Sequence, residues 1–313
     1  MQVIYDLKTL PDAFCGGVVS IGKFDGMHLG HTLIIHRLKS HAGRLRVPSI
    51  VMTFDPPPIR ILRPEQDARP ICTLERKIEL IRTFAPDALV VLPTNRELLE
   101  QSAETFFYEM LKNRLDAKVV VEGRNFTFGR DRIGNSESIR VYGRWTGIEI
   151  DIVEPMQLGE RIISSSGIRR LLGEGRVEQA NELMPQPYQM AGTVVTGDRR
   201  GRTLGFPTAN LDGVETILPK SGLYATVTQV DNRCHASTTH IGPNTTFGQS
   251  DPRIETFLHD FDADLYGKTL YVDFHARIRD SVRFDTAGEL VRQMNIDIQQ
   301  SREITASVLS RTE

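Results

Sequence analysis

The sequence predicts two domains: an α/β domain built on a parallel sheet, and an antiparallel β domain that ends in a helix. A chain of 313 residues is longer than one ordinary hydrophobic core supports. In the first half, continuous apolar runs alternate with stretches of helical periodicity, which is typical of parallel sheets covered on both faces. From Met190 onward, short runs rich in β-branched and aromatic residues are separated by turn residues, which is typical of an antiparallel barrel or sandwich.

The elements of the first half follow from these patterns in order. Apolar runs predict strands at 18–21, 49–54, 88–94, 117–123 and 147–156. Helical periodicity predicts helices at 29–41, 73–84 and 102–115. Because ligands of such sheets bind beyond the carboxyl ends of the strands, we expect a site directly after one of these runs.

The second half changes its period after a proline-rich break. Two short helices are predicted at 166–172 and 177–184, and Pro185 and Pro187 then end the helical pattern. We therefore divide the chain into domains of 1–185 and 186–313. Strand-like runs follow at 191–197, 222–230, 233–242, 253–261 and 269–279, and a last helix is predicted at 286–309.

Composition restricts the partners and the compartment. A quarter of the residues are charged and the net charge is only -2, so no nucleic-acid or membrane partner is indicated. No window is apolar enough to span a bilayer, and the N-terminus lacks the pattern of an export signal. The cysteines at 15, 72 and 234 are odd in number and far apart, which fits a reducing cytoplasm.

The most informative motif of the first half is GKFDGMHLGH at 22–31, directly after the first predicted strand. Small residues let backbone amides approach a ligand closely, and the N-terminus of a following helix favours an anion. His28 and His31 could then donate hydrogen bonds to phosphate oxygens. The alternatives are a chance pair or a metal pair, but a helical metal pair favours i, i+4 spacing and a third ligand, which is not evident.

Two further stretches of the first half could bind phosphate. ISSSGIR at 163–169 places hydroxyls and Arg169 at the start of a helix, although a serine run is more often an N-cap. GRNFTFG at 123–129 again follows a buried strand, although taken alone it is only a turn.

The second half carries a glycine-rich stretch and an isolated acid. Between 192 and 210 the chain reads GTVVTG and then GRTLGFPTAN, in which a glycine-rich backbone could wrap a phosphate. Thr208 offers a hydroxyl and Asn210 an amide oxygen to Mg²⁺. Glu255 lies within an apolar strand pattern. The alternatives are plain hairpin geometry and a solvent-facing strand residue.

Taken together, the motifs carry a resemblance. The order of GKFDGMHLGH, TFDPPP (53–58), GRNFTFG, ISSSGIR and GRTLGFPTAN resembles that of the bacterial bifunctional riboflavin kinase/FAD synthetase family. The resemblance runs from about Val18 to Arg302. It implies a Rossmann-like nucleotidyltransferase domain at 1–185 and a β-barrel riboflavin kinase domain at 186–313, with riboflavin, FMN and ATP as substrates and Mg²⁺ as cofactor.

For the first domain, the resemblance implies adenylylation of FMN to FAD. His28 and His31 would hold the ATP phosphates, and Arg169 would close with two serines over the leaving pyrophosphate. Asn125 would contact the nucleotide or the flavin. The binding residues implied here are Gly22, Phe24, Asp25, Gly30, Asn125, Ser164 and Ser165.

For the second domain, the resemblance implies phosphorylation of riboflavin. Glu255 would be the general base for the riboflavin 5′-hydroxyl. Arg279 would lie near the flavin, and Thr208 and Asn210 would bind the metal. The binding residues implied here are Gly197, Arg202, Gly205, Thr208, Asn210 and Arg279.

The sequence departs from the family pattern at two places. Pro57 stands where the family usually has a histidine, and 245–247 read Thr-Thr-Phe where it often has Pro-Thr-Phe. Pro57 leaves open a kinase-only enzyme whose first domain has a weakened or inactive adenylyltransferase site. A nucleic-acid binder with a small barrel is a second alternative, but acidic residues outnumber basic ones from 186 onward.

Overall fold

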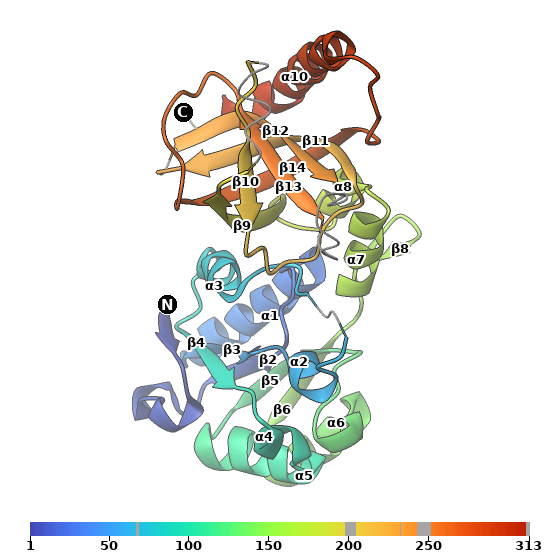
Figure 1. Ribbon diagram of the computed structural model, residues 1–313. Coiled ribbons are helices and arrows are strands. Elements are labelled where there is room, and N and C mark those ends of the chain that lie inside the picture. Colours follow the sequence, from blue (N-terminus) through green and yellow to red (C-terminus); the bar gives the residue numbers. More distant parts are fainter. Residues whose placement is uncertain (67–68, 198–204, 232, 243–251, 311–313) are drawn as a thin grey trace. The chain divides into compact units, whose positions relative to one another are not determined.

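The computed structural model describes residues 1–66, 69–197, 205–231, 233–242 and 252–310. The chain forms two compact units (Figure 1). The first consists of Met1–Ala68 and Thr73–Ser164, and the second of Arg69–Cys72 and Ser165–Glu313. The predicted domains of 1–185 and 186–313 divide the chain at a later point, and the boundary between the functional domains stays a prediction.

A six-stranded sheet forms the centre of the first unit. Neighbouring strands pair in parallel in the order β1-β4-β3-β2-β5-β6. The five predicted strands are confirmed, and a short edge strand that the sequence did not reveal pairs with β4. The strands are β1 (Gln2–Ile4), β2 (Val18–Ile21), β3 (Ser49–Asp55), β4 (Ala88–Pro93), β5 (Val119–Gly123) and β6 (Glu149–Val153).

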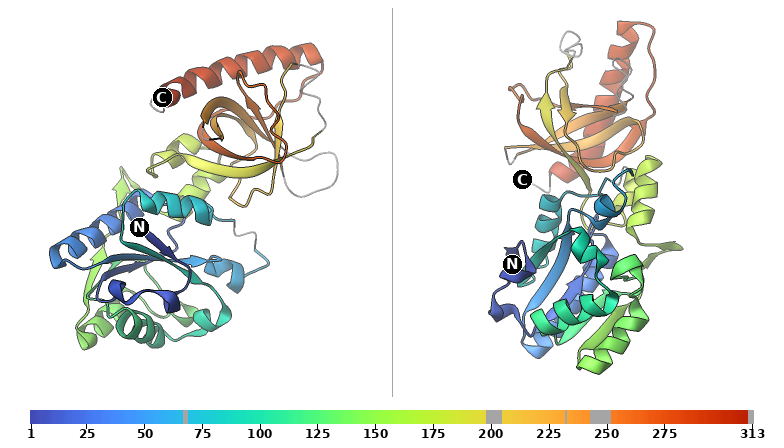
Figure 2. Two further views of the ribbon diagram at one scale, coloured as in Figure 1. Left: turned by 90° about the vertical axis from the view of Figure 1, so that its left-hand side faces the viewer. Right: turned by 60° about the horizontal axis from the view of Figure 1, so that its bottom comes forward.

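Helices cover both faces of this sheet, as the parallel pattern predicted (Figure 2). One buried apolar cluster joins the sheet to α1 and α3, and another joins it to α5, the following π-helical stretch and α6. The short helices α2 and α4 and the longer α6 were not predicted. The helices are α1 (Leu29–Leu45), α2 (Pro58–Leu62), α3 (Leu74–Arg82), α4 (Arg96–Glu100), α5 (Ala103–Phe106), the π-helix Phe107–Arg114 and α6 (Ser136–Thr146).

The order of the strands defines where a ligand can enter the first unit. The chain runs outward from β2 through β3 and β4 on one side, and through β5 and β6 on the other. The crevice between the carboxyl ends of β2 and β5 is therefore a topological switch point, where open α/β sheets bind nucleotides. The two strands pair only at Val18–Val119 and Val19–Val120. Beyond them, the buried Glu122 carboxylate accepts a hydrogen bond from the Ile21 N–H.

The second unit is built on a closed barrel of six antiparallel strands in the order β10-β13-β12-β11-β14-β9. The structure thus decides between the barrel and the sandwich that the sequence left open. The strand β10 was not predicted. The strands are β9 (Tyr188–Val195), β10 (Ala209–Asp212), β11 (Gly222–Val230), β12 (Arg233–Gly242), β13 (Arg253–Leu258) and β14 (Thr269–Arg279). A separate two-stranded hairpin in the first unit joins β7 (Gln157–Leu158) and β8 (Arg161–Ile162).

Two helices that precede the barrel are attached to it. These are α7 (Ser165–Gly173) and α8 (Val177–Asn181), both predicted. The Asn181 side chain donates to the Phe274 carbonyl at 2.8 Å and accepts from the Tyr188 N–H at 2.9 Å. The Lys220 N–H donates to the carbonyl of Leu172, the penultimate residue of α7. These contacts explain why the second unit begins at Ser165 rather than at the proline-rich break.

The long helix α10 (Ala287–Leu309) confirms the last predicted helix, and it packs on the outer surface of the barrel. Thr286 caps its N-terminus by accepting a hydrogen bond from the Glu289 N–H. The Ser301 hydroxyl donates to the Ser237 carbonyl of β12 at 2.7 Å. Because both groups are buried, this bond satisfies polar atoms that would otherwise cost free energy.

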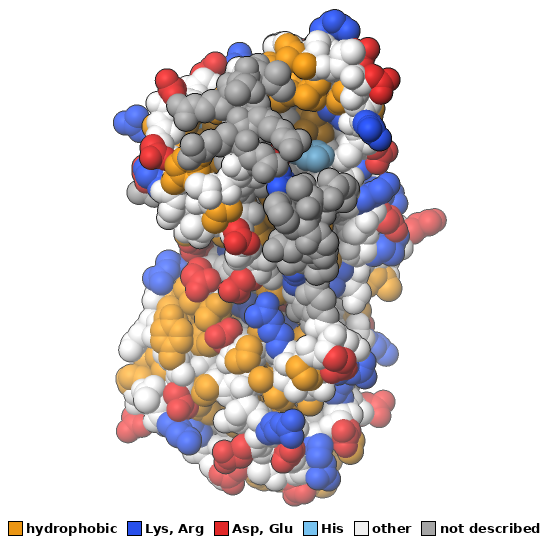
Figure 3. Space-filling model, in the orientation of Figure 1, with side chains coloured by type: hydrophobic (Ala, Val, Ile, Leu, Met, Phe, Trp, Pro, Cys, Tyr) orange, Lys and Arg blue, Asp and Glu red, His pale blue; other side chains and the backbone are white. Residues whose placement is uncertain are grey.

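The surface of the described residues agrees with the balanced composition. Lysine, arginine and acidic side chains are interspersed on the face shown in Figure 3, without a broad patch of one sign. Among the described helices, none combines the length and the apolar character that a membrane span requires.

Candidate active sites

The first site begins at the loop between β2 and α1. Phe24 and Met27 have positive φ angles of 45° and 39°, and both side chains are buried in the core. The core contacts therefore hold the backbone of this loop in a conformation that side chains rarely adopt. The Gly22 N–H donates to the Met52 carbonyl, which ties the start of the loop to β3. The predicted motif thus lies at the carboxyl edge of the sheet.

His28 and His31 lie together at the N-terminus of α1. His28 is the N-cap residue, and its Nδ1 accepts a hydrogen bond from the His31 N–H at 3.3 Å. Because Nδ1 accepts, the proton of the neutral ring belongs on Nε2. The two rings are stacked, with centroids 3.6 Å apart and planes inclined by 15°. Gly30 leaves room for the His28 ring, since a Cβ there would lie 3.1 Å from the His28 Nδ1.

Both imidazoles are neutral at physiological pH. Burial lowers the pKa of His28 to about 4, although Asp25 opposes the shift. Burial lowers the pKa of His31 well below its ordinary value, and the neighbouring His28 and Lys77 lower it further, because each disfavours a second positive charge. The His31 Nδ1 is buried without a hydrogen-bond partner in the described part of the chain. The His31 ring can therefore hydrogen-bond to an incoming anion through this atom without first losing a partner.

The other predicted residues of the first site have different positions. Asn125 is exposed in the turn after β5, the neighbour of β2 at the switch point. The Ile163 carbonyl lies 3.9 Å from the Cβ position of Gly30, so the chain just before Ser164 reaches the histidine loop. Ser165 and Arg169 belong to the second unit, where Arg169 donates to the Arg69 carbonyl. Pro57 is the N-cap residue of α2.

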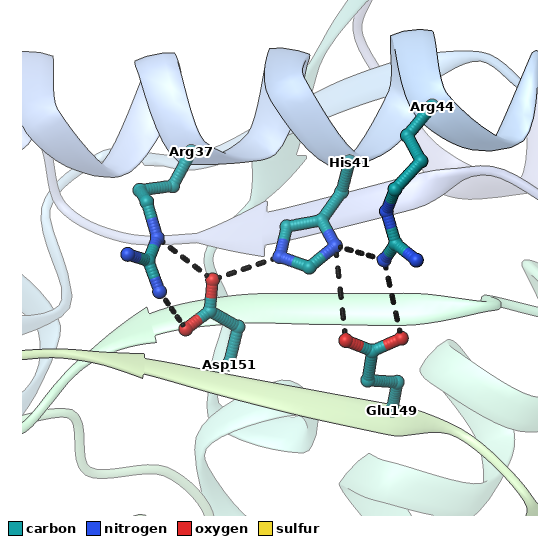
Figure 4. Close-up of polar contacts among 5 residues, drawn as sticks. All are labelled: Arg37, His41, Arg44, Glu149 and Asp151. Atoms are coloured by element: carbon teal, nitrogen blue, oxygen red, sulfur yellow. Dashed lines mark hydrogen bonds and ion pairs between the residues drawn. The ribbon is translucent and has the colours of Figure 1, made fainter.

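A cluster of charged residues fixes α1 against β6 (Figure 4). Arg37 donates to both carboxylate oxygens of Asp151, at 3.0 and 2.7 Å, and the His41 Nε2 lies 2.9 Å from the same carboxylate. Arg44 donates to the His41 Nδ1 at 2.9 Å and lies 3.5 Å from Glu149. These contacts attach the helix that carries the paired histidines to the edge strand of the sheet.

The second site lies on the outer face of the barrel. Asn210 of β10 pairs directly with Glu255 of β13, which in turn pairs with His240 of β12. Directly paired residues of antiparallel strands point to the same face, with Cβ atoms about 5 Å apart. The alternate residues Leu211, Ile254 and Ile241 are buried on the other face. The register therefore brings the predicted base and one predicted metal ligand side by side.

Glu255 lies in a polar and partly exposed environment. Its carboxylate is 3.6 Å from the Arg253 guanidinium, and both side chains are 29% exposed. His240, which the sequence analysis did not single out, lies close enough for Glu255 to affect its pKa. Burial lowers the pKa of His240 and the Glu255 carboxylate opposes that shift. The sequence signal for His240 was its position in the predicted strand 233–242, two residues before Gly242.

The stretch that contains Thr208 is attached beside Glu255. The Phe206 ring packs edge-on against Phe257, two residues from Glu255, with centroids 5.7 Å apart. Asn210 occupies the space over Gly197, since a Cβ on Gly197 would lie 2.2 Å from the Asn210 amide. Gly205 has a φ of 87°, which suits a glycine.

Of the two arginines predicted for this site, the structure describes only Arg279. Arg279 forms a bidentate ion pair with the buried Asp297 of α10, with the shortest contact at 2.7 Å. Its guanidinium also lies over the Phe284 ring at 5.8 Å. Arg202 and the stretch 245–247 lie outside the described residues.

The described residues offer oxygen ligands that suit Mg²⁺, but these ligands are too few to hold the ion without others. They contain no group of three or more His, Cys, Asp or Glu side chains that could hold a metal ion. A hydroxyl from Thr208 and an amide oxygen from Asn210 are hard ligands of the kind that Mg²⁺ accepts. Such a site needs phosphate oxygens from a nucleotide to complete its ligands.

A predicted anion site at the switch point of an α/β unit, together with an acid beside two predicted metal ligands on a barrel, indicates an enzyme that acts on nucleotide phosphates. Comparisons with known proteins identify its family. The FAD synthetase family matches residues 11–167 and the riboflavin kinase family matches residues 184–305. The chain belongs to the bifunctional riboflavin kinase/FMN adenylyltransferase family, and the resemblance seen in the motifs is confirmed.

Relatives match the chain over nearly its full length. A bifunctional riboflavin kinase/FMN adenylyltransferase of Listeria monocytogenes is 33% identical over 93% of each chain. That of Bacillus subtilis is 34% identical over 91% of each chain. A crystal structure described as a macrolide-efflux protein from Streptococcus pneumoniae has a TM-score of 0.86 and 30% identity, and it covers 96% of this chain and 98% of its own. The whole fold is thus similar to that of a solved structure.

Proposed function

We propose how the two activities of the family are divided among the residues of this chain. The chain phosphorylates riboflavin to FMN with ATP, and it adenylylates FMN with ATP to give FAD and pyrophosphate. In our proposal the loop between β2 and α1 serves the adenylylation of FMN. The outer face of β10, β13 and β12 serves the phosphorylation of riboflavin. The placement of His28 and His31 at the switch point is the observation that supports the adenylylation site. The pairing of Asn210 with Glu255 is the observation that supports the kinase site.

In the adenylylation, an oxygen of the FMN phosphate attacks the α-phosphorus of ATP and the bond to the β-phosphate breaks, so pyrophosphate leaves. His28 and His31 donate hydrogen bonds to the phosphate oxygens on which charge develops, and their neutral rings retain these protons in the free enzyme. The N-terminus of α1 adds a positive potential. Ser164, Ser165 and Arg169 hold the leaving pyrophosphate.

The remaining residues of the adenylylation site bind rather than react. Backbone amides of the loop from Gly22 to Gly30 approach the phosphates, and Asn125 contacts the nucleotide or the flavin. Phe24 fixes the loop from inside the core, where it is 1% exposed. Asp25 lies close enough to His28 to oppose the effect of burial on the pKa of that ring, and it belongs to the proposed binding residues.

In the kinase reaction, Glu255 accepts the proton of the riboflavin 5′-hydroxyl as its oxygen attacks the γ-phosphorus of ATP, and ADP leaves. The partly exposed carboxylate can accept a proton from a bound alcohol and later release it to solvent. Thr208 and Asn210 would hold Mg²⁺ together with ATP phosphates, and the ion would neutralise charge on the transferred group. Gly197, Gly205 and Arg202 bind the nucleotide, and Arg279 borders the flavin.

The kinase assignment is tested by Glu255→Gln. The variant removes the proton acceptor but keeps the shape, so FMN formation should fall by about 10²-fold or more. Adenylylation of FMN supplied from outside should be unchanged in the same protein, which serves as the internal control. A folded Glu255→Gln protein that makes FMN at nearly the original rate would remove Glu255 from this role.

The adenylylation assignment is tested by His31→Ala. Loss of one transition-state donor costs about 3 kcal/mol, or roughly two orders of magnitude in rate. We expect FAD formation from FMN and ATP to be lost while FMN formation from riboflavin continues. His36→Ala is a matched control, because His36 lies on α1 but is exposed and packs edge-on against Phe84. Unchanged FAD formation in His31→Ala would contradict the assignment.

A kinase-only enzyme is the alternative, and Pro57 is the observation that favours it. A proline side chain has no donor, so the ring cannot replace the hydrogen bonds of the usual histidine. Incubation of the unmodified protein with saturating FMN, ATP and Mg²⁺ decides between the two functions. We further propose that the enzyme works in the cytoplasm, which is supported by Cys15, Cys72 and Cys234, none of which forms a disulfide.

A further inference from the structure

A buried lysine lies beside the histidine pair and has no place in the mechanism above. Lys77 belongs to α3, and its side chain is only 5% exposed. Lysine is almost never this deeply buried unless its charge is paired, because removal of an ammonium group from water is costly. The position of Lys77 therefore requires an explanation.

The Lys77 ammonium is directed to the carboxyl edge of the sheet. It donates a hydrogen bond of 3.3 Å to the Thr53 hydroxyl, near the end of β3. The Thr53 hydroxyl donates in turn to the carbonyl of Lys23, in the loop that leads to the histidines. The preceding residue of β3, Met52, pairs with Ile21, the last residue of β2. Lys77 thus reaches the same edge and the same loop as His28 and His31.

No negative charge compensates this ammonium in the part of the chain that the structure describes. Thr53 is its one hydrogen-bond partner there, and no carboxylate forms an ion pair with it. A threonine hydroxyl carries no charge, so two of the three ammonium N–H groups have no described acceptor. The nearby His31 Nδ1 is also buried without a partner. The Lys77 ammonium and the His31 ring therefore lie near each other, and no anionic acceptor is described beside them.

We propose that Lys77 is a phosphate-binding residue of the adenylylation site and holds the β- and γ-phosphates of ATP, which leave as pyrophosphate. This inference rests on the proposed adenylylation function. A phosphate is the chemical group that this set of donors fits, because each oxygen can accept several hydrogen bonds and its charge compensates the ammonium. Lysine binds a phosphate as a compact point charge, whereas Pro57 cannot donate a hydrogen bond at all.

The proposal also explains the arrangement around His31. Burial of this ring and the positive charge of Lys77 beside it both disfavour the imidazolium, which is consistent with the neutral state of His31 in the free protein. Binding of a polyanion would place negative charge between the lysine and the histidine. The buried ammonium thus trades stability of the free protein for affinity, a cost that binding sites commonly carry.

The test is Lys77→Met, which keeps much of the apolar stem and removes the charge. Lys112→Met is the matched control, since Lys112 lies in the same unit and forms a surface ion pair with Asp116. The probe is inorganic pyrophosphate with Mg²⁺, titrated by calorimetry into the full-length protein. We expect pyrophosphate affinity to fall at least 10-fold in Lys77→Met, since a hydrogen bond to a charged group is worth about 1.5–3 kcal/mol. FAD formation should fall by a similar or larger factor.

Thermal unfolding separates binding from a structural role. Removal of an uncompensated buried charge should leave the melting temperature of Lys77→Met unchanged or raise it. FMN formation by the second unit should be unaffected. A lower melting temperature with unchanged pyrophosphate affinity would overturn the proposal and make Lys77 a structural residue. If the unmodified protein makes no FAD, adenylylation fails as its function, yet the pyrophosphate titration still decides whether Lys77 binds phosphate.

Discussion

The buried carboxyl group of Glu122 offers a prediction that depends on pH. Glu122 is 3% exposed on β5, and it accepts a hydrogen bond from the Ile21 N–H at the point where β2 and β5 separate. Burial raises its pKa well above the ordinary value of 4.5. The folded protein therefore holds Glu122 as a neutral acid over a range of pH in which the unfolded chain ionises it.

The sign of the effect follows from proton binding. Between the unfolded and the folded pKa, the unfolded state binds fewer protons, so the free energy of unfolding falls as the pH rises. The stability is fully present below pH 4.5 and declines by about 1.4 kcal/mol for each pH unit above it, until the folded pKa is reached. For a unit of this size, 1 kcal/mol shifts the melting temperature by about 2–4 °C. The expected slope is thus about 3–6 °C per pH unit.

The substitution Glu122→Gln removes this titration and keeps an oxygen that can accept from Ile21. Its melting temperature should exceed that of the unmodified protein by an amount that grows as the pH rises above 4.5, until the folded pKa of Glu122 is reached. Calorimetry or circular dichroism across this range measures the difference. Glu160→Gln, an exposed position in the turn between β7 and β8, should change stability by no more than about 0.5 kcal/mol at any pH. A difference for Glu122→Gln that is the same at every pH would refute the reasoning.

Two further predictions concern the second unit and Pro57. A fragment of 165–313 should make FMN and melt at a higher temperature than a fragment of 186–313. The reason is that only the longer fragment keeps the contacts of α7 and α8 with the barrel. Equal melting temperatures of the two fragments would contradict this prediction. Pro57→His should leave FMN formation unchanged and increase the rate of FAD formation from FMN, as followed by chromatography of the flavins. A rate that stays the same would mean that the added ring does not reach the phosphates.

Local sequence patterns were sufficient for most of the architecture. A buried parallel strand must be apolar on both faces, so runs such as those of β2 and β4 are visible without any knowledge of their neighbours. The sequence failed for β10, whose four residues include Asn210 and Asp212, since these residue types disfavour strands. It also failed for α6, which contains Gly143 in its last turns. In both cases contacts with the rest of the unit override weak local preferences.

The motifs, and through them the family, were likewise determined by the sequence alone. A glycine two residues after His28 and a hydroxyl two residues before Asn210 are features of short stretches, which the sequence shows directly. What the tertiary structure decided is which distant residues meet. Only the strand register places Asn210 beside Glu255 and His240. Only the packing of α3 and of β5 shows that Lys77 and Glu122 are buried, with Lys77 bonded to Thr53 of β3 and Glu122 to Ile21 of β2. The reason is physical: a charged residue in a helical or strand pattern is read as solvent-facing by default, and its burial depends on chain segments far away in the sequence.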